Sequence, residues 1–275
     1  MILVTGATGT VGRNVVDHLL EAHAEVRPVS RHPERAALPA GPAAVRGDLA
    51  EPDSLRTALQ GVDRVFLFPA AAPLDRFLDL ARDAGVRHVV LLSSSAAADG
   101  EPSAIGRSHQ VHERAVAASG LPWTFLRPGA FMANDLMWAP TVRGDGVVRA
   151  PYVQAATAPI DERDIAAVAV RALLDEDPHA GRAYQLTGPE SLTVADRVQI
   201  LGTVLGRPLR LVELDPAQAR ELMAARMPAS VVDAVLGLMA RAGSSAPVSP
   251  GVEQVTGRPP HTYAEWVTHN AAAWA

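Results

Sequence analysis

A glycine-spaced turn close to the N-terminus constrains the fold more than any other feature. The apolar run Ile2-Leu3-Val4-Thr5 leads directly into Gly6-Ala7-Thr8-Gly9-Thr10-Val11-Gly12. Closely spaced glycines let a backbone approach a diphosphate, and the first N–H groups of the following helix have no partner inside that helix. The spacing is G-x-x-G-x-x-G instead of the better-known G-x-G-x-x-G, but its strand-to-helix context predicts nucleotide binding; a tight turn without a ligand is the alternative. The predicted contacts are Gly6, Thr8, Gly9, Thr10, Val11 and Gly12.

Short apolar runs alternate with amphipathic segments through the first half of the chain. Strands are expected over residues 2–5, 25–30, 43–47, 64–68, 88–93 and 124–127, and helices over 10–22, 53–60, 74–84 and 108–119. Short, continuous apolar runs suit strands that are buried on both faces. Right-handed crossovers join strands that alternate with helices, so the pattern predicts an α/β fold, a doubly wound parallel sheet of the Rossmann type.

The second half of the chain has a different rhythm. Residues 131–159 resemble a loop; helices are then expected over 161–174, 194–205 and 227–242, and strands over 183–187 and 209–214. Asp215 and Pro216 are expected to open a further helix as N-cap and first position. Residues 243–260 form a Ser/Pro/Gly-rich connector, and Thr262 with Glu265 begins a last helix that ends near Trp274. We expect one domain over residues 1–150, to which 161–190 return, and a smaller α+β region over 191–275.

Composition narrows the possible functions. The net charge is −5 and no basic block stands out, which argues against a nucleic-acid partner. Cysteine is absent, so thiolate metal sites are excluded, and the spacing of the histidines also predicts no metal. Because no apolar run is long enough for a membrane span and a strand is expected from residue 2, we expect neither a membrane segment nor a signal peptide. We expect a cytoplasmic protein, with monomer and homodimer both left open.

The residues after the second expected strand bear on the choice of cofactor. NAD enzymes usually place an acidic residue there for the ribose 2′-hydroxyl, whereas this chain has Ser30-Arg31. A guanidinium can hold a 2′-phosphate through two parallel hydrogen bonds, so Arg31, assisted by Arg13 and Arg35, favours NADP(H); an Arg31 that only faces water is the alternative. Asp48, after the third expected strand, suits the adenine amino group or is a turn or N-cap residue.

Six segments occur in an order that is typical of one family. They are the turn over residues 6–12, Arg31, Gly47-Asp48-Leu49, Val90-Leu91-Leu92-Ser93-Ser94-Ser95, residues 119–129 (SGLPWTFLRPG), and Ile160-Asp161 with Arg163-Asp164-Ile165-Ala166. Together they resemble the NmrA-like, atypical branch of the short-chain dehydrogenase/reductase superfamily, most strongly over residues 1–190. The resemblance implies a Rossmann domain that binds NAD(P)(H), with Leu49 in a cofactor-binding segment, and a C-terminal part that closes a substrate pocket. The family includes quinone and azo-type reductases, tailoring reductases and redox sensors.

The catalytic signature of that superfamily is missing from this chain. The signature is Tyr-x-x-x-Lys with a serine, and its lysine lowers the tyrosine pKa. All 25 basic residues of this chain are arginine, so it has no lysine. Gly106 stands in the place of the tyrosine and Gln110 in the place of the lysine. His109 and Glu113 lie four residues apart on one face of the same expected helix. Glu113 could therefore orient His109 to give a proton to a substrate. The alternative is that the two residues form a purely structural pair.

Strand ends and the resemblance assign further residues. The carboxyl ends of the strands line the ligand crevice of such a sheet, and Ser93 and Ser95 lie where the fifth expected strand ends. The resemblance implies that Ser95 stands at the catalytic serine and Ser93 beside the cofactor; a serine-rich turn that satisfies its own backbone is the alternative. Phe68-Pro69 resembles the segment under the cofactor ribose, and Phe131 the stretch beside the nicotinamide.

Large apolar side chains gather after the sixth expected strand. They are Phe131, Met132, Met137 and Trp138. These residues predict contacts to a small hydrophobic substrate, with ordinary packing as the alternative. We expect an NADPH-dependent reductase that transfers hydride to a planar hydrophobic acceptor, such as a quinone, an enone or an aromatic polyketide-like compound, without the Tyr–Lys pair. A non-catalytic NADP(H)-binding sensor, or a cyclase or isomerase that retains the cofactor, are the alternatives.

Overall fold

A parallel sheet forms the centre of the N-terminal part of the molecule. The computed structural model describes residues 1–36, 38, 41–69, 73–98, 103–225 and 227–275. Within these ranges the sheet contains β1 (Ile2–Val4), β2 (Val26–Ser30), β3 (Val45–Arg46), β4 (Arg64–Leu67), β5 (His88–Leu92), β6 (Trp123–Pro128) and β9 (Arg182–Leu186). The strand order is β3-β2-β1-β4-β5-β6-β9 and these pairings are all parallel. The predicted doubly wound parallel sheet is therefore confirmed.

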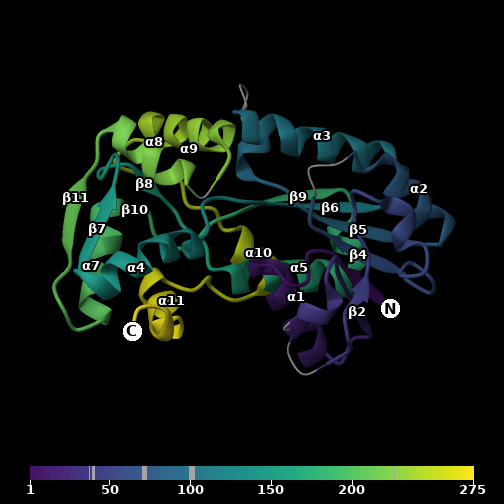
Figure 1. Ribbon diagram of the computed structural model, residues 1–275. Helices are drawn as coiled ribbons and strands as arrows, with labels where there is room; N and C mark the ends of the chain where they lie inside the picture. Colours follow the sequence, from purple (N-terminus) through teal and green to yellow (C-terminus); the bar gives the residue numbers. More distant parts are fainter. Residues whose placement is uncertain (37, 39–40, 70–72, 99–102, 226) are drawn as a thin grey trace.

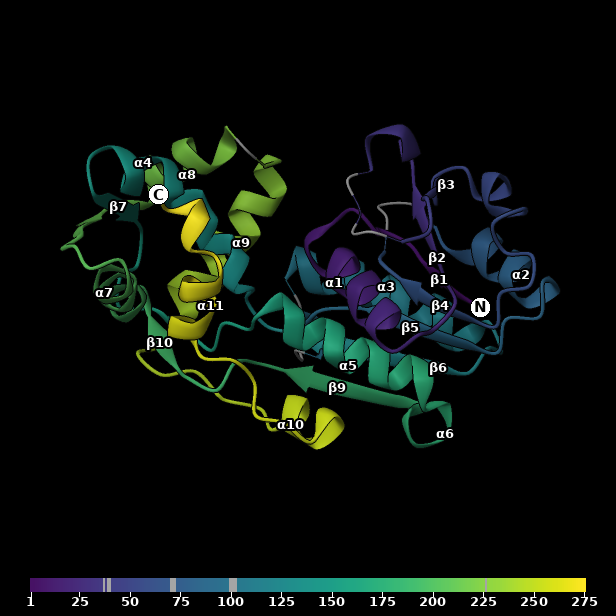
Figure 2. The same ribbon diagram turned by 90° about the horizontal axis from the view of Figure 1, so that it is seen from below.

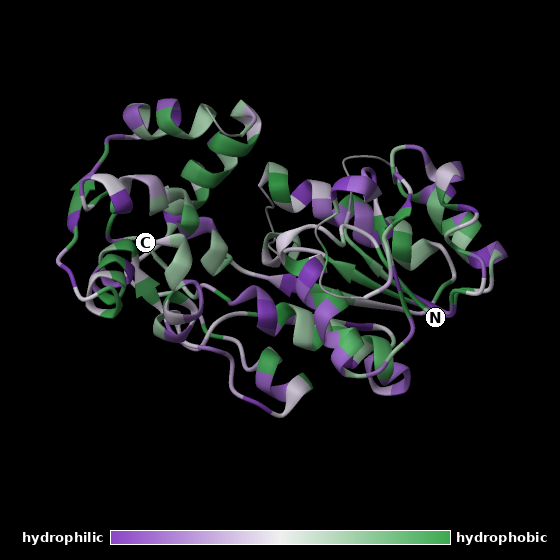
Figure 3. Cartoon of the chain, turned by 60° about the horizontal axis from the view of Figure 1, so that its bottom comes forward, coloured by the Kyte–Doolittle hydropathy of each residue, from purple (hydrophilic) through white to green (hydrophobic). Residues whose placement is uncertain are grey.

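Helices cover both faces of this sheet. On one face lie α1 (Thr10–Glu21), α5 (Glu162–Leu174) and α10 (Gly251–Thr256), and on the other α2 (Asp75–Asp83) and α3 (Ala104–Ala118) (Figure 1). Successive side chains of a strand point to opposite faces. Val4 and Phe66 accordingly join the core under α1 and α5, whereas Leu3 and Val65 join the core under α2 and α3. The central strands of the sheet have the colour of hydrophobic residues in Figure 3.

The short helix α6 (Glu176–His179) lies beside the start of β9, and a second group of elements gathers at the end of the molecule to which the arrow of β9 points (Figure 2). They are η4 (Met132–Trp138), α4 (Ala139–Gly144), β7 (Val147–Ala150), β8 (Ala156–Thr157), β10 (Leu192–Thr193), α7 (Val194–Val204), β11 (Arg210–Glu213), α8 (Pro216–Ala224), α9 (Ala229–Arg241) and α11 (Tyr263–His269). Two small sheets join β7 to β11 in parallel and β8 to β10 in antiparallel. This C-terminal part has apolar clusters of its own, one around Trp138 and Trp266 and one around α8 and α9.

Two predicted helix starts are confirmed by their caps. Asp215 accepts hydrogen bonds from the backbone of Ala217 and Gln218 at the start of α8, and Gln218 completes a capping box. Thr262 and Glu265 form a second capping box at the start of α11. In both places a local side-chain motif is sufficient to set the helix start.

Four local predictions are wrong. Residues 131–159 are not a loop but contain η4, α4, β7 and β8. Residues 243–260 contain α10, and its position is set by packing, because a Cβ on Gly251 would lie 2.2 Å from the Gln185 carbonyl oxygen of β9. The helix expected over 53–60 is a 3₁₀ turn, η2 (Pro52–Leu55). The last helix ends at His269, and a 3₁₀ turn, η5 (Ala271–Ala273), follows it.

Candidate functional site

The glycine turn lies between β1 and α1 and needs glycine for steric reasons. Gly6 has a φ of +61°, in the left-handed region that side chains disfavour. A Cβ on Gly12 would lie 2.1 Å from the Gly6 carbonyl oxygen, so α1 approaches the turn more closely than any side chain permits. Gly9, the N-cap of α1, hydrogen-bonds through its N–H to the Gly6 carbonyl oxygen at 2.9 Å. The turn is therefore a tight cradle of backbone.

The N-terminus of α1 is open to an anion. Within the described residues, no side chain caps this helix, and its first turn holds no acidic residue. The N–H groups of the first helical turn have no partner inside the helix, and together with the positive end of the helix dipole they favour a negatively charged ligand there. The helix begins beside β1 and β4, where the strand order reverses and where ligands bind in sheets of this type. Thr8 and Thr10 lie exposed at this place, as the sequence predicts for diphosphate contacts.

Phe68 and Pro69 follow β4 at the same edge. Phe68 is 47% exposed, unusual for a large apolar side chain, and its backbone N–H donates to Thr5 Oγ1 at 2.8 Å. A Cβ on Gly6 would lie 2.9 Å from the Phe68 Cβ, so the ring stands directly beside the glycine turn. An exposed aromatic ring next to an anion-binding backbone is suited to the ribose or base of a dinucleotide. The side chains present therefore fit such a cofactor.

Arg31 follows the end of β2 and is exposed. Within the described part of the chain its guanidinium makes no hydrogen bond and no ion pair, so its charge remains available to a ligand. Arg13 in the first turns of α1 is also exposed, whereas the Arg35 Nε atom lies 3.9 Å from a Glu34 carboxylate oxygen. A free guanidinium at this edge fits a 2′-phosphate.

Asp48 and Leu49 are engaged within the protein. The Asp48 Oδ1 atom accepts the Ala50 N–H at 2.9 Å, and the Asp48 N–H donates to Ser54 Oγ at 3.0 Å. These bonds match the turn residue that the sequence left as an alternative. The Leu49 side chain is buried in the core beneath α2 and α3, so only its backbone is available to a cofactor.

Ser93, Ser95 and His109 lie near the carboxyl end of β5. Ser93 is buried and its hydroxyl donates to Glu113 Oε1 at 2.6 Å, whereas Ser95 begins η3 (Ser95–Ala98) and is half-buried. Glu113 also accepts both Arg127 Nε–H at 2.9 Å and Arg127 Nη2–H at 2.7 Å. Its hydrogen bonds thus go to Ser93 and Arg127, not to His109 as the sequence suggested.

His109 has a ring nitrogen that no described residue hydrogen-bonds. The His109 Nδ1 atom is buried and has no hydrogen-bond partner among the described residues. Burial lowers the pKa of His109, and the nearby His112 lowers it further, while Glu113 opposes both. A neutral imidazole can donate or accept one hydrogen bond here but is a weak proton source at pH 7.

The four residues expected to contact a substrate divide into two pairs. Phe131 and Met137 are half-buried, and Met137 packs against the apolar clusters of both α7 and α8–α9. Met132 is 1% exposed and Trp138 is 6% exposed, so both belong to the core of the C-terminal part. The Arg197 guanidinium lies 5.3 Å from the centre of a Trp138 ring, a cation–π contact within this core.

A buried polar network that the sequence did not predict lies beneath η4. Arg197 Nη1 donates to both carboxylate oxygens of Asp135, at 2.6 and 2.7 Å, and Tyr263 Oη–H donates to Asp135 Oδ2 at 2.8 Å. These three residues come from η4, α7 and α11. Because they lie up to 128 positions apart, no spacing in the sequence reveals the network.

Glu162 makes a second buried link to η4. Its Oε1 atom accepts the Ala133 N–H at 2.7 Å and its Oε2 atom accepts Trp266 Nε1–H at 3.2 Å. Burial raises the pKa of Glu162 from 4.5 to about 7, although these hydrogen bonds oppose the shift.

Glu162→Gln is expected to flatten the pH dependence of stability. As the pH rises from 4.5 to about 7, the folded protein keeps a proton on Glu162 that the unfolded chain has lost, so stability falls through this window. The loss amounts to about 3 kcal/mol in the wild type and is absent in the variant. Urea unfolding across this pH range measures it, with the exposed Glu253→Gln as control. An equal pH dependence in wild type and Glu162→Gln contradicts the prediction.

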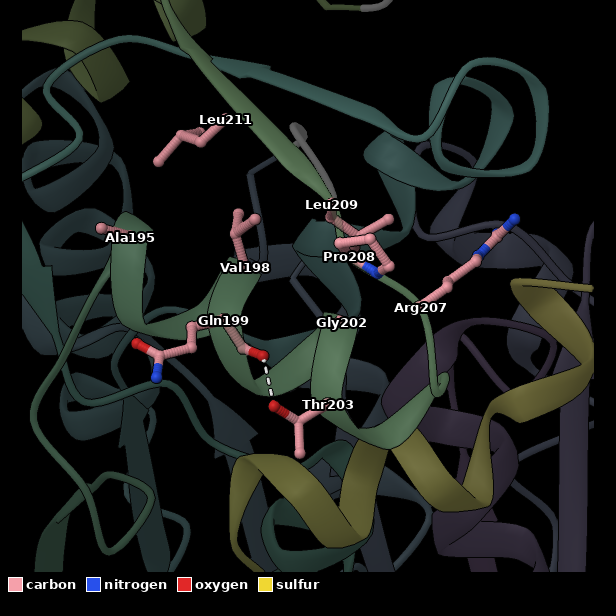
Figure 4. A pocket seen from close by; sticks show the side chains of 9 residues that line it. All are labelled: Ala195, Val198, Gln199, Gly202, Thr203, Arg207, Pro208, Leu209 and Leu211. Atoms are coloured by element: carbon pink, nitrogen blue, oxygen red, sulfur yellow. Dashed lines mark hydrogen bonds between the residues drawn. The ribbon is translucent and has the colours of Figure 1, made fainter.

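An open groove of about 560 Å³ lies elsewhere, on α7 and the start of β11 (Figure 4). It is lined by Ala195, Val198, Gln199, Gly202, Thr203, Arg207, Pro208, Leu209 and Leu211. These elements lie at the opposite end of the molecule from the sheet and the glycine turn (Figure 1). The groove is therefore separate from the candidate site.

The described residues show neither a metal cluster nor a membrane-spanning segment. Within them, no three His, Asp or Glu side chains come together as metal ligands would. None of the helices in the described ranges is long and apolar enough to cross a bilayer.

Comparison with known proteins agrees with this geometry. Residues 6–176 match a family described as NAD(P)H-binding. The chain is 45% identical to a (4-alkanoyl-5-oxo-2,5-dihydrofuran-3-yl)methyl phosphate reductase of Streptomyces griseus and 40% identical to an NAD(P)H azoreductase of Xenophilus azovorans, covering 100% of this chain and 99% of each relative. The NADPH complex of an Escherichia coli NADPH-dependent quinone oxidoreductase has a TM-score of 0.81 at 26% identity, over 98% of this chain and 100% of that one.

Proposed function

Because the chain belongs to this NAD(P)H-binding family, whose relatives include NAD(P)H-dependent reductases, we propose that it reduces a planar, conjugated, hydrophobic acceptor with NADPH. The observation that carries the proposal is the open N-terminus of α1 behind the glycine turn, with a free Arg31 at the next strand end. The nicotinamide supplies a hydride when the cofactor is bound.

Each part of the site has a role in this proposal. The backbone over residues 6–12 holds the diphosphate, and Arg31 holds the 2′-phosphate. Phe68 packs against the ribose, and Phe131 with Met137 faces the acceptor. Ser95 and His109 orient the acceptor by hydrogen bonds. We further propose that residues 191–275, except for α10 on the sheet, close over the acceptor.

The missing Tyr–Lys pair favours a conjugated acceptor over a simple ketone. Hydride addition to an isolated ketone yields a strongly basic alkoxide, which needs an acid positioned beside it. Gln110 stands in the place of the lysine and donates to the Ala97 carbonyl oxygen at 2.9 Å, so it holds η3 instead. A quinone or enone spreads the added charge over its conjugated system and takes its proton later from water. The name of the Streptomyces griseus relative describes such a ring, a 5-oxo-2,5-dihydrofuran with an alkanoyl group.

A panel of acceptors tests the proposal. NADPH oxidation is expected with menadione and with a 3-acyl butenolide, and not with cyclohexanone. NADPH binding without oxidation across the panel would instead indicate a redox sensor. A converted product that carries no deuterium from stereospecifically labelled NADPH would indicate a cyclase or isomerase.

Arg31→Ala is expected to weaken NADPH binding by about 1.5–3 kcal/mol while NADH binding stays nearly unchanged. The estimate is the range for a lost hydrogen bond to a charged group. Titration calorimetry with both cofactors measures it, and Arg210→Ala, exposed on β11, is the matched control. Equal losses for NADPH and NADH would show that Arg31 does not contact the 2′-phosphate.

A further inference from the structure

One buried carboxylate ties α3 to two neighbouring strands. Glu113 is 7% exposed and accepts hydrogen bonds from Ser93, directly after β5, and from Arg127 in β6. The Arg127 contact is bidentate, which fixes its direction as well as its distance. Glu113 therefore determines where α3 lies along the carboxyl ends of β5 and β6.

The direction of α3 places His109 beyond those strand ends. In a right-handed crossover between two parallel strands, the helix runs opposite to the strands. A residue four positions before Glu113 therefore lies about 6 Å farther out, towards the C-terminal part. This residue is His109, on the same face of the helix. The start of α3 meets α9 on this side, so His109 lies where the two parts of the molecule face each other (Figure 1).

We propose that Glu113 is a positioning residue, which through Ser93 and Arg127 fixes α3 so that the imidazole of His109 faces the acceptor. The proposal rests on the proposed reductase function. It explains why the buried Glu113 carboxylate, one helical turn from His109, hydrogen-bonds to Ser93 and Arg127 and not to His109. The His109 side chain as a whole is half-buried, so part of its ring stays open on this side, whereas its Nδ1 atom is enclosed and has no hydrogen-bond partner in the described part of the protein.

A double-mutant cycle tests the link between the two residues. Glu113→Gln and His109→Gln are each expected to lower kcat with menadione about tenfold or more, with the Kd for NADPH changed less than twofold. The variant carrying both changes is expected to be no slower than His109→Gln alone, because Glu113 acts through His109. Additive losses, or an unchanged kcat in His109→Gln, would overturn the proposal.

The control is Glu176→Gln, which changes a half-buried carboxylate between Arg64 and Arg87 outside the site. Its kcat is expected to match the wild type. If Glu113→Gln does not fold, Ser93→Ala removes one hydrogen bond of the cluster and enters the same cycle, with the same expected non-additivity.

Histidine NMR separates this inference from the reductase function. If wild type reduces no acceptor, the reductase proposal fails, but the ring signals of His109 still report its position. Glu113→Gln is then expected to shift the His109 signals, assigned by His109→Gln, and Glu176→Gln to leave them unchanged. His109 signals that do not move in Glu113→Gln would overturn the positioning role.

Discussion

Gly9→Val is expected to abolish the binding of both NADPH and NADH while the fold survives. Gly9 is the N-cap of α1 with a φ of −82°, which any residue can adopt. A Cβ at this position would contact the Gly6 carbonyl oxygen at 3.2 Å, a tight contact that requires only a small shift. The rest of the valine side chain would project into the space before the N–H groups of the first helical turn, where we propose that the diphosphate binds. We expect at least a 100-fold rise in Kd for each cofactor, or about 3 kcal/mol.

Fluorescence titration with both cofactors measures this loss, and thermal unfolding checks the fold. Gly144→Val is the matched control, because a Cβ there meets nothing within 4 Å at the end of α4. Gly12 is a poorer choice, since a Cβ would lie 2.1 Å from backbone and disturb α1 itself. Cofactor affinities within twofold of wild type in Gly9→Val would contradict backbone binding of the diphosphate.

The sheet could be predicted from sequence because its signals are local. Each central strand is a short apolar run, and the predicted ends lie within two residues of the observed ones, as for β1 and β5. Side-chain caps at Asp215 and Thr262 fixed two helix starts in the same way. The short elements between residues 131 and 159 could not be predicted, because β7 has its partner, β11, some sixty residues farther along the chain.

The candidate site was only partly predictable, for a similar reason. The glycine turn and Arg31 depend on neighbours in sequence, and the structure places them at one edge of the sheet. The i,i+4 spacing of His109 and Glu113 suggested a pair, but the better donors for the carboxylate are Ser93 and Arg127 on two strands. Aromatic clustering after β6 likewise suggested a substrate surface, whereas burial places Trp138 in a core.

Arg197→Ala is expected to destabilise the protein by about 3–5 kcal/mol. Arg197 and Asp135 are both nearly inaccessible, at 7% and 3% exposure, and the change leaves the Asp135 charge buried without its cation. Equilibrium unfolding in urea at pH 8 measures the loss. The control is Arg171→Ala, which breaks the exposed Arg171–Asp175 pair of 2.7 Å and should cost less than about 0.5 kcal/mol.

The same variant is expected to lose less stability in acid. Burial raises the pKa of Asp135, and Arg197 opposes that shift, so removing Arg197 raises the pKa further. The folded variant then keeps a proton that the unfolded chain loses above its ordinary pKa of 3.8, and its stability falls as the pH rises from there. The deficit relative to wild type should therefore be smaller at pH 5 than at pH 8. An equal deficit at both pH values would show that Asp135 is not the group left unpaired.

Replacing both Asp135 and Arg197 separates the contribution of this ion pair to protein stability from its effect on the conformation of η4. A variant with Asp135→Leu and Arg197→Met leaves no buried charge and is expected to recover most of the lost stability. Asp135 also holds η4 to Tyr263, and η4 carries Met137, which we propose faces the acceptor, so this variant should still show a raised KM for menadione. Unchanged NADPH affinity together with a raised KM for the acceptor would show that the network acts on function through the conformation of η4. Recovery of both stability and KM would show instead that apolar packing alone determines the conformation of η4.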